Sequence, residues 1–167
     1  MSNKKTFAVI GVSEAKSLFL AKQIAKGNQV LLFDQNAATL LTVHTQILLE
    51  NPAANVEMMI CPTNASWEAD VIVLSNYSAT DSTLAEKIRK VATGKIVLVL
   101  VNEKNPIIFE NSSDKLQNLY PFSKVIRSIE SPNDLIDSFF LRGNDADAVK
   151  TILTLFTHIG LKTSILI

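Results

Sequence analysis

The sequence predicts an α/β fold, in which helices cover both faces of a doubly wound, mostly parallel sheet of about eight strands. Short apolar runs typical of strands alternate with segments of helical periodicity from residue 7 to residue 101. The runs 71–74 and 96–101 are rich in β-branched residues, which suits central strands covered on both faces. Parallel strands need crossover connections, and the intervening segments are long enough to supply them as helices.

The first third of the chain predicts two strand–helix pairs. The apolar run 7–10 stops at a glycine, and a helix follows until Gly27. A second strand is expected over 29–33, with Asp34 or Asn36 capping the next helix. That helix must end before Pro52.

The middle of the chain continues the alternation. A third strand is expected over 56–60, although Glu57 interrupts it, with a loop at Pro62 and Asn64. The strand at 71–74 precedes a helix whose capping box is Thr83–Glu86 and which ends before Gly94, and residues 96–101 form the fifth strand.

The last part of the chain is more irregular. Residues 102–121 predict a long loop with one short helix, followed by strands over 124–129 and 138–141. An amphipathic helix is expected between Asp145 and Gly160, and a final strand over 162–167. We expect residues 1–167 to form one domain.

The charge balance disfavours two classes of partner. Sixteen basic residues offset 16 acidic ones, so no overall positive field attracts nucleic acid or anionic lipid. The apolar runs are shorter than a bilayer span, and the N-terminal region lacks the pattern of a secretory signal. The expected location is the cytoplasm, without nucleic-acid or membrane partners.

The segment after the first strand is a degenerate form of the GxGxxG dinucleotide motif. Its three glycine positions are occupied by Gly11, Ser13 and Lys16. Ser13 places a side chain where a phosphate would pack, although its hydroxyl can donate a hydrogen bond. Lys16 is either a charge for a phosphate held by the first-turn amides or a solvated lysine. Glu14 counts against an anion at this place.

Asp34 ends the second strand at roughly the ~20-residue spacing of a ribose-binding acid. A carboxylate there would accept the ribose hydroxyls and repel a 2′-phosphate, which favours NAD over NADP. A helix cap is the alternative, and the two roles are compatible. Strand order should reverse between the first and fourth strands, so that residues 11–16 meet residues 75–77.

In the order of its segments the chain resembles the family of deazaflavin-dependent NADP reductases. The matching segments are Phe7–Gly11, Gly27–Val30, Trp67–Leu74, Gly94–Val97, Asn105-Pro106, Lys124–Arg127 and Leu141–Asp145. The resemblance implies a Rossmann-like domain that binds NAD or NADP and transfers a hydride to a small molecule. In the family, a further C-terminal segment beyond the position of Ile167 helps to cover the substrate.

The resemblance also implies the residues that hold the cofactor. The pyrophosphate would lie against Gly11, Val12, Ser13, Glu14 and Ala15, and Lys16 completes the loop. Asp34 would bind the adenosine ribose. The nicotinamide side would face Ser75, Asn76 and Tyr77, while the catalytic residues are unassigned.

The other chemistry-bearing residues predict structural roles. His44 and His158 lack ligand-spaced neighbours, so no metal site is expected. We expect Cys61, the single cysteine, to be a buried thiol at a strand end, and Trp67 to be a packing anchor.

Two functional hypotheses remain from the sequence. The first is an NAD(P)-binding protein related to oxidoreductases. The second is a noncatalytic interaction or regulatory module that has lost dinucleotide binding, as Ser13 and Lys16 would suggest. The apolar end 165–167 also predicts a homodimer through a sheet edge.

Overall fold

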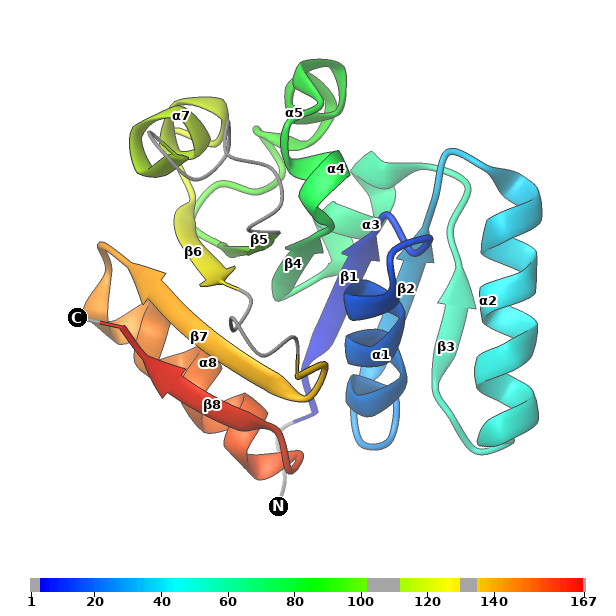
Figure 1. The fold of residues 1–167 in the computed structure, drawn as a ribbon. Coiled ribbons are helices and arrows are strands. Elements are labelled where there is room, and N and C mark those ends of the chain that lie inside the picture. The colour runs from blue at the N-terminus through cyan, green and yellow to red at the C-terminus, as the bar shows by residue number, and fades with distance from the viewer. Residues whose placement is uncertain (1–3, 102–111, 130–134, 167) are drawn as a thin grey trace.

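The computed structural model describes residues 4–101, 112–129 and 135–166. Their backbone forms eight strands and seven helices within these ranges (Figure 1). The strands are β1 (Thr6–Ile10), β2 (Gln29–Phe33), β3 (Val56–Met58), β4 (Val71–Leu74), β5 (Ile96–Val101), β6 (Lys124–Ile129), β7 (Ser138–Gly143) and β8 (Lys162–Ile165). The helices are α1 (Ala15–Ile24), α2 (Ala37–Glu50), α3 (Pro62–Glu68), α4 (Asn76–Ala79), α5 (Ser82–Ile88), α7 (Ser112–Leu119) and α8 (Ala146–His158).

All eight strands belong to one sheet with the order β3-β2-β1-β4-β5-β6-β7-β8. Neighbouring strands are parallel except β6 and β7, which pair antiparallel. The order reverses between β1 and β4, as expected for a doubly wound sheet. The predicted fold class is therefore confirmed.

Two helix starts follow the sequence pattern closely. Asn36 caps α2 by accepting a hydrogen bond from the Thr39 amide at 3.0 Å. Asp145 caps α8 by accepting one from the Ala148 amide at 2.8 Å. Each cap satisfies a backbone donor that the helix itself leaves unpaired.

Several local predictions are wrong. Pro62 begins α3 instead of marking a loop, because its fixed φ and missing N–H suit the first turn of a helix. The cap of α5 is Asp81, whose carboxylate accepts hydrogen bonds from the Thr83 and Leu84 amides, so Thr83 is not the N-cap. The third strand ends at Met58, two residues before the predicted end.

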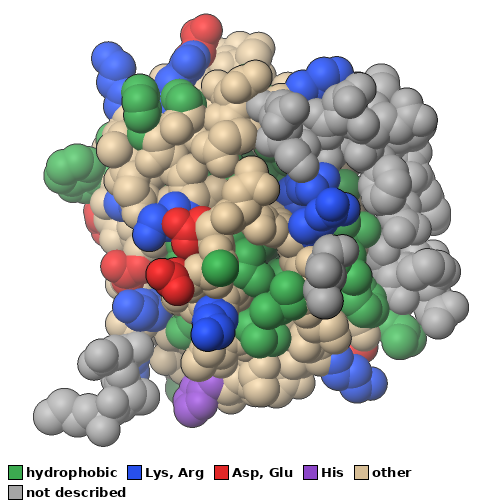
Figure 2. Space-filling view, turned by 90° about the vertical axis from the view of Figure 1, so that its left-hand side faces the viewer, with side chains coloured by type: hydrophobic (Ala, Val, Ile, Leu, Met, Phe, Trp, Pro, Cys, Tyr) green, Lys and Arg blue, Asp and Glu red, His purple; other side chains and the backbone are tan. Residues whose placement is uncertain are grey.

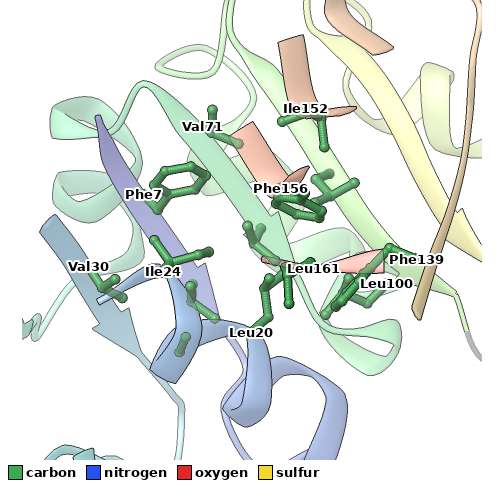
Figure 3. Packing of buried hydrophobic residues seen from close by; sticks show 14 of the residues in the cluster. Phe7, Leu20, Ile24, Val30, Val71, Leu100, Phe139, Ile152, Phe156 and Leu161 are labelled. Carbon is green, nitrogen blue, oxygen red and sulfur yellow. The ribbon is translucent and has the colours of Figure 1, made fainter. Parts of the chain in front are cut away.

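The core consists of two apolar layers, one on each face of the sheet. One layer joins the strands to α1, α2 and α8, and the other joins them to α3, α4, α5 and α7. Figure 3 shows the first layer, in which Ile152 and Phe156 of α8 lie near Val71 and Leu100 of the central strands. Phe156 also meets the Phe139 ring edge-on at a centroid distance of 5.1 Å. This packing attaches the β7–β8 end to the centre of the sheet.

The β8 edge carries apolar side chains in solvent. Ile165 is 43% exposed and Leu166 is 38% exposed. Figure 2 shows hydrophobic side chains gathered on the side of the molecule that holds β7 and β8, with Lys and Arg side chains beside them. The homodimer predicted from this end stays a prediction.

Two residues lie in surroundings different from those expected. Cys61 is half-buried at the cap position of α3, not a buried thiol at a strand end. Trp67 is 68% exposed, because it lies on the outer face of α3. The expected Asn105-Pro106 turn lies outside the described residues, whereas α7 supplies the short helix expected between 102 and 121.

Across residues 4–101, 112–129 and 135–166, no helix is both long and apolar enough to cross a membrane. In the same ranges, no group of three or more His, Cys, Asp or Glu side chains is placed to hold a metal ion.

Candidate functional site

The site lies where the carboxyl ends of β1 and β4 meet. The Ser75 amide donates to the Ile10 carbonyl at 3.0 Å, and the Gly11 amide donates to the Phe33 carbonyl at 2.9 Å. These bonds continue the parallel pairing by one residue beyond the strands. The loops after β1, β2 and β4 are thereby held at one edge of the sheet, as predicted.

Gly11 is required by the geometry of this edge. Its φ is 85°, a conformation that residues with a Cβ rarely adopt. A Cβ at this position would also overlap the side chains of Ser75 and Ser78. The glycine therefore allows both the turn into α1 and the close approach of the loop after β4.

A cavity of about 210 Å³ opens between these loops, and we call it the Gly11 cavity. Its lining combines apolar side chains from the strand ends with polar side chains from the loops. The lining residues are Ile10, Gly11, Ser13, Phe33, Asp34, Gln35, Asn36, Ser75, Tyr77, Ser78, Asp81 and Leu84. Five of the predicted site residues thus share one cavity, namely Gly11, Ser13, Asp34, Ser75 and Tyr77.

Asp34 connects the loop after β1 to the start of α2. One carboxylate oxygen accepts a hydrogen bond from the Val12 amide at 2.9 Å, and the other accepts one from the Asn36 amide at 2.9 Å. Each oxygen of a carboxylate can accept a second hydrogen bond, so the group keeps acceptor capacity toward the cavity. Asn36, not Asp34, is the N-cap of α2.

The start of α1 leaves backbone donors open. Among the described residues, the amides of Ser13, Glu14 and Ala15 have no hydrogen-bond acceptor. Glu14 stands at the cap position, yet its side chain makes no capping bond to α1. Open amides together with the helix dipole suit an anion at this place.

The solvated role, one of the two alternatives expected for Lys16, is wrong, and its role toward a phosphate stays a prediction. Its side chain is buried, so it is not a solvated lysine. Its ammonium donates to the Ser138 carbonyl at 2.6 Å and to the Leu135 carbonyl at 3.2 Å, and it lies 4.2 Å from the centroid of the Phe139 ring. Lys16 therefore points toward β7 and is not part of the cavity lining.

The loop after β4 forms the short helix α4, which the sequence analysis did not predict. Ser75 caps this helix by accepting a hydrogen bond from the Ser78 amide at 3.2 Å, and its own hydroxyl lies 2.9 Å from the Ser78 hydroxyl. Ser75 and Asn76 are buried, whereas Tyr77 is 76% exposed. The Tyr77 ring is thus the accessible part of this loop.

A second cavity of about 250 Å³ adjoins the first, and we call it the Lys87 cavity. The two cavities share Phe33, Gln35, Asp81 and Leu84 in their linings, and the second adds Pro62, Thr83 and Lys87. None of these residues belongs to the site predicted from the sequence. The acid at Asp81, directly before the α5 stripe, is the one signal that would have drawn attention to this region.

Charge around the Gly11 cavity is negative. Asp34 and Asp81 are its charged lining residues, and Lys87 lines only the adjoining cavity. Asp81 also accepts a hydrogen bond from the Gln35 side chain at 3.1 Å. The cavity therefore suits hydroxyl and amine donors, and a bound phosphate would depend on backbone amides.

No protein-family model and no curated protein matches the sequence. Solved structures do match the fold. A protein of Arthrobacter sp. FB24, assigned as an F420-dependent NADP reductase, is 21% identical at a TM-score of 0.72, over 97% of this chain and 84% of that one. An imine reductase of Myxococcus stipitatus in complex with NAD+ is 14% identical at a TM-score of 0.73, over 97% of this chain and 54% of that one.

A UDP-glucose dehydrogenase of Pyrobaculum islandicum is also similar, with 11% identity and a TM-score of 0.71. The match covers 99% of this chain and 46% of the dehydrogenase. The chain therefore spans about half the length of these two larger enzymes. At these identities the likeness establishes a Rossmann-like fold, shared with these two reductases and this dehydrogenase.

Proposed function

We propose that this protein binds NAD(H) across the carboxyl ends of β1, β2 and β4. The observation that carries the proposal is one cavity lined both by Ser13, which bears the first of the open amides before α1, and by Asp34. In Rossmann-like folds these two features hold the diphosphate and the adenosine ribose, respectively. The resemblance to NAD(P)-dependent enzymes in solved structures supports the same ligand class.

The adenosine half fits the two adjoining cavities. The ribose hydroxyls would donate to Asp34, which keeps acceptor capacity after binding the Val12 and Asn36 amides. The adenine ring would lie among the side chains of Phe33, Leu84 and Pro62, which line the shared and outer parts of the cavities. A lining of apolar side chains with a few polar groups is typical of sites that bind small molecules and cofactors.

The same carboxylate favours NAD(H) over NADP(H). A 2′-phosphate would lie beside Asp34, and among the described residues no Lys or Arg lines the Gly11 cavity to offset the repulsion. Lys87 lines only the outer cavity. We therefore expect NADPH to bind more weakly than NADH.

The nicotinamide would extend past the loop after β4, along the side of Ser75 and Tyr77. Hydride transfer depends on aligning the donor and acceptor carbons, and the cofactor supplies the hydride. The exposed Tyr77 ring would contribute a flat wall for a small acceptor. On this proposal the protein is related in function, as well as in fold, to oxidoreductases.

Calorimetric titration with NADH, NAD+, NADPH and NADP+ tests the proposal. Saturable binding of NADH, with weaker binding of NADPH, is the expected result. Absence of heat for all four dinucleotides at millimolar concentration would reject the proposal. A thermal-shift series with the same ligands provides an independent readout.

A noncatalytic module is the second candidate function. It is favoured by the engagement of Lys16 with backbone carbonyls, since the loop then offers no side-chain cation to a phosphate. Such a module would bind a partner without turning over a substrate. NADH oxidation with any hydride acceptor, above the rate without protein, would exclude it.

A further inference from the structure

Glu14 links the starts of two helices through its side chain. One carboxylate oxygen accepts a hydrogen bond from the Asn76 amide at 3.0 Å, and the other accepts one from the Tyr77 amide at 3.3 Å. The carboxylate therefore spans from the start of α1 to the loop after β4. It joins segments that lie far apart in the sequence.

This link places a negative charge at the edge of the Gly11 cavity. Glu14 lies between Ser13, which lines the cavity, and Ala15, the first residue of α1. Tyr77, one of its two partners, also lines the cavity. The charge is thus next to the open amides that would hold a diphosphate.

Backbone amides are the hydrogen-bond partners of this charge, whereas the described lining of the Gly11 cavity supplies no side-chain cation beside it. Lys16 is two residues away in sequence, and its ammonium donates to the Ser138 carbonyl at the start of β7. In the part of the chain that the structure describes, the Gly11 cavity lining contains the carboxylates of Asp34 and Asp81 and no Lys or Arg. A second anion at the start of α1 would therefore meet repulsion at short range.

We infer that Glu14 sets the ligand preference of the site. Its charge weakens the binding of the diphosphate group and leaves the binding of adenosine unaffected. The inference rests on the proposed function. The nucleoside part would lie beside Asp34, toward β2, whereas Glu14 reaches toward the loop after β4. The charge of Glu14 therefore weakens the binding of the diphosphate and does not affect the adenosine.

The test compares NADH and adenosine binding to the wild-type protein and the Glu14→Gln variant by calorimetry. The amide side chain keeps an oxygen acceptor for one of the two backbone amides and removes the charge. The expected result is about tenfold tighter NADH binding by the variant, with adenosine affinity unchanged. Glu14→Ala, which removes the charge and both contacts, should tighten NADH binding as well.

Glu68→Gln provides the matched control. It removes the same charge from the last residue of α3, two residues before Asp70, whose amide donates to the Thr6 carbonyl at the opposite edge of the sheet. This control should bind both ligands as the wild type does.

Two results would overturn the inference, and they differ in what they leave standing. Equal or weaker NADH binding by both Glu14 variants, with adenosine binding intact, overturns the role of Glu14 and leaves the proposed nucleotide site. Failure of the wild type and both variants to bind either ligand overturns the inference together with the proposed function.

Discussion

The carboxylate of Asp34 accepts a hydrogen bond from the Val12 amide, so the end of β2 holds the loop that follows β1. The same side chain holds the start of α2 through the Asn36 amide. Asp34 is therefore part of the local structure before any ligand binds. Its proposed role toward a ribose adds to this structural role.

Replacing Asp34 by Asn should lower stability. The amide side chain has one oxygen acceptor, so one of the two backbone amides loses its partner, at a cost of about 1–2 kcal/mol. Urea denaturation measures the change. Asp137→Asn is the control, because its 3.5 Å ion pair with Lys162 is exposed and contributes little. A loss no larger than that of the control would contradict the structural role.

Asp34→Asn should also reduce the difference in binding affinity between NADH and NADPH. Without the negative charge, a 2′-phosphate meets less repulsion, so the NADH-to-NADPH affinity ratio should fall several-fold. Calorimetry on both proteins measures the ratio. An unchanged ratio would show that Asp34 does not face the ribose.

Gly11→Ala should be severely destabilising. The residue has a positive φ, and the added Cβ would overlap the side chains of Ser75 and Ser78. We expect a loss of about 2–4 kcal/mol, as found where strain and overlap combine. Gly27→Ala is the matched control, since no atom lies within 4 Å of its added Cβ. Equal unfolding midpoints for the two variants would contradict the structure.

Lys16→Met should reduce stability without weakening nucleotide binding. Methionine keeps an apolar stem beside Phe139 but leaves the carbonyls of Ser138 and Leu135 without this donor, which costs about 1–3 kcal/mol. Lys26→Met, at an exposed position, should be close to neutral. Weaker NADH binding by a folded Lys16→Met protein would restore the phosphate-binding role that the sequence suggested.

Cys61 should react with iodoacetamide at lower pH than a free thiol does. A hydrogen bond from the Asn64 backbone lowers the pKa of the Cys61 thiol. A lowered pKa means that the thiolate, the reactive form, is present at pH values where a free thiol is still protonated. The alkylation rate against pH should therefore have its midpoint below that of N-acetylcysteine. Cys61→Ser gives the background, because the sequence has one cysteine. A midpoint equal to that of the free thiol would refute the effect.

The sheet was predictable because its signals are local. β4 and β5 are continuous apolar runs, and Asn36 and Asp145 are caps whose partners lie three residues away. Each of these features is visible in a short window of sequence.

The shorter elements were not predictable in the same way. α4 has four residues, which is too few to show a helical periodicity. Pro62 is expected in a loop, but a proline that disrupts the interior of a helix favours its first turn. The wrong prediction that Trp67 is a packing anchor has the same origin, because the orientation of the unpredicted helix α3 decides whether the Trp67 side chain is buried.

The site depends on contacts between distant residues. The motif placed Gly11 and Asp34 correctly at one edge of the sheet, since both directly follow strands. The partners of Lys16 and Glu14 belong to other elements, and no spacing rule connects them. The sequence therefore predicted the edge of the sheet at which the cavity lies, but not the directions in which the side chains of Lys16 and Glu14 point.

We propose that a dinucleotide binds at the open amides before α1 and at Asp34. Amide NMR spectra of the labelled protein, recorded while NADH is added, test it directly. We expect the largest shifts at Ser13, Ala15, Asp34 and Tyr77, with little change on α8. Spectra that stay unchanged at millimolar NADH, or shifts confined to residues outside the Gly11 and Lys87 cavities, would contradict it.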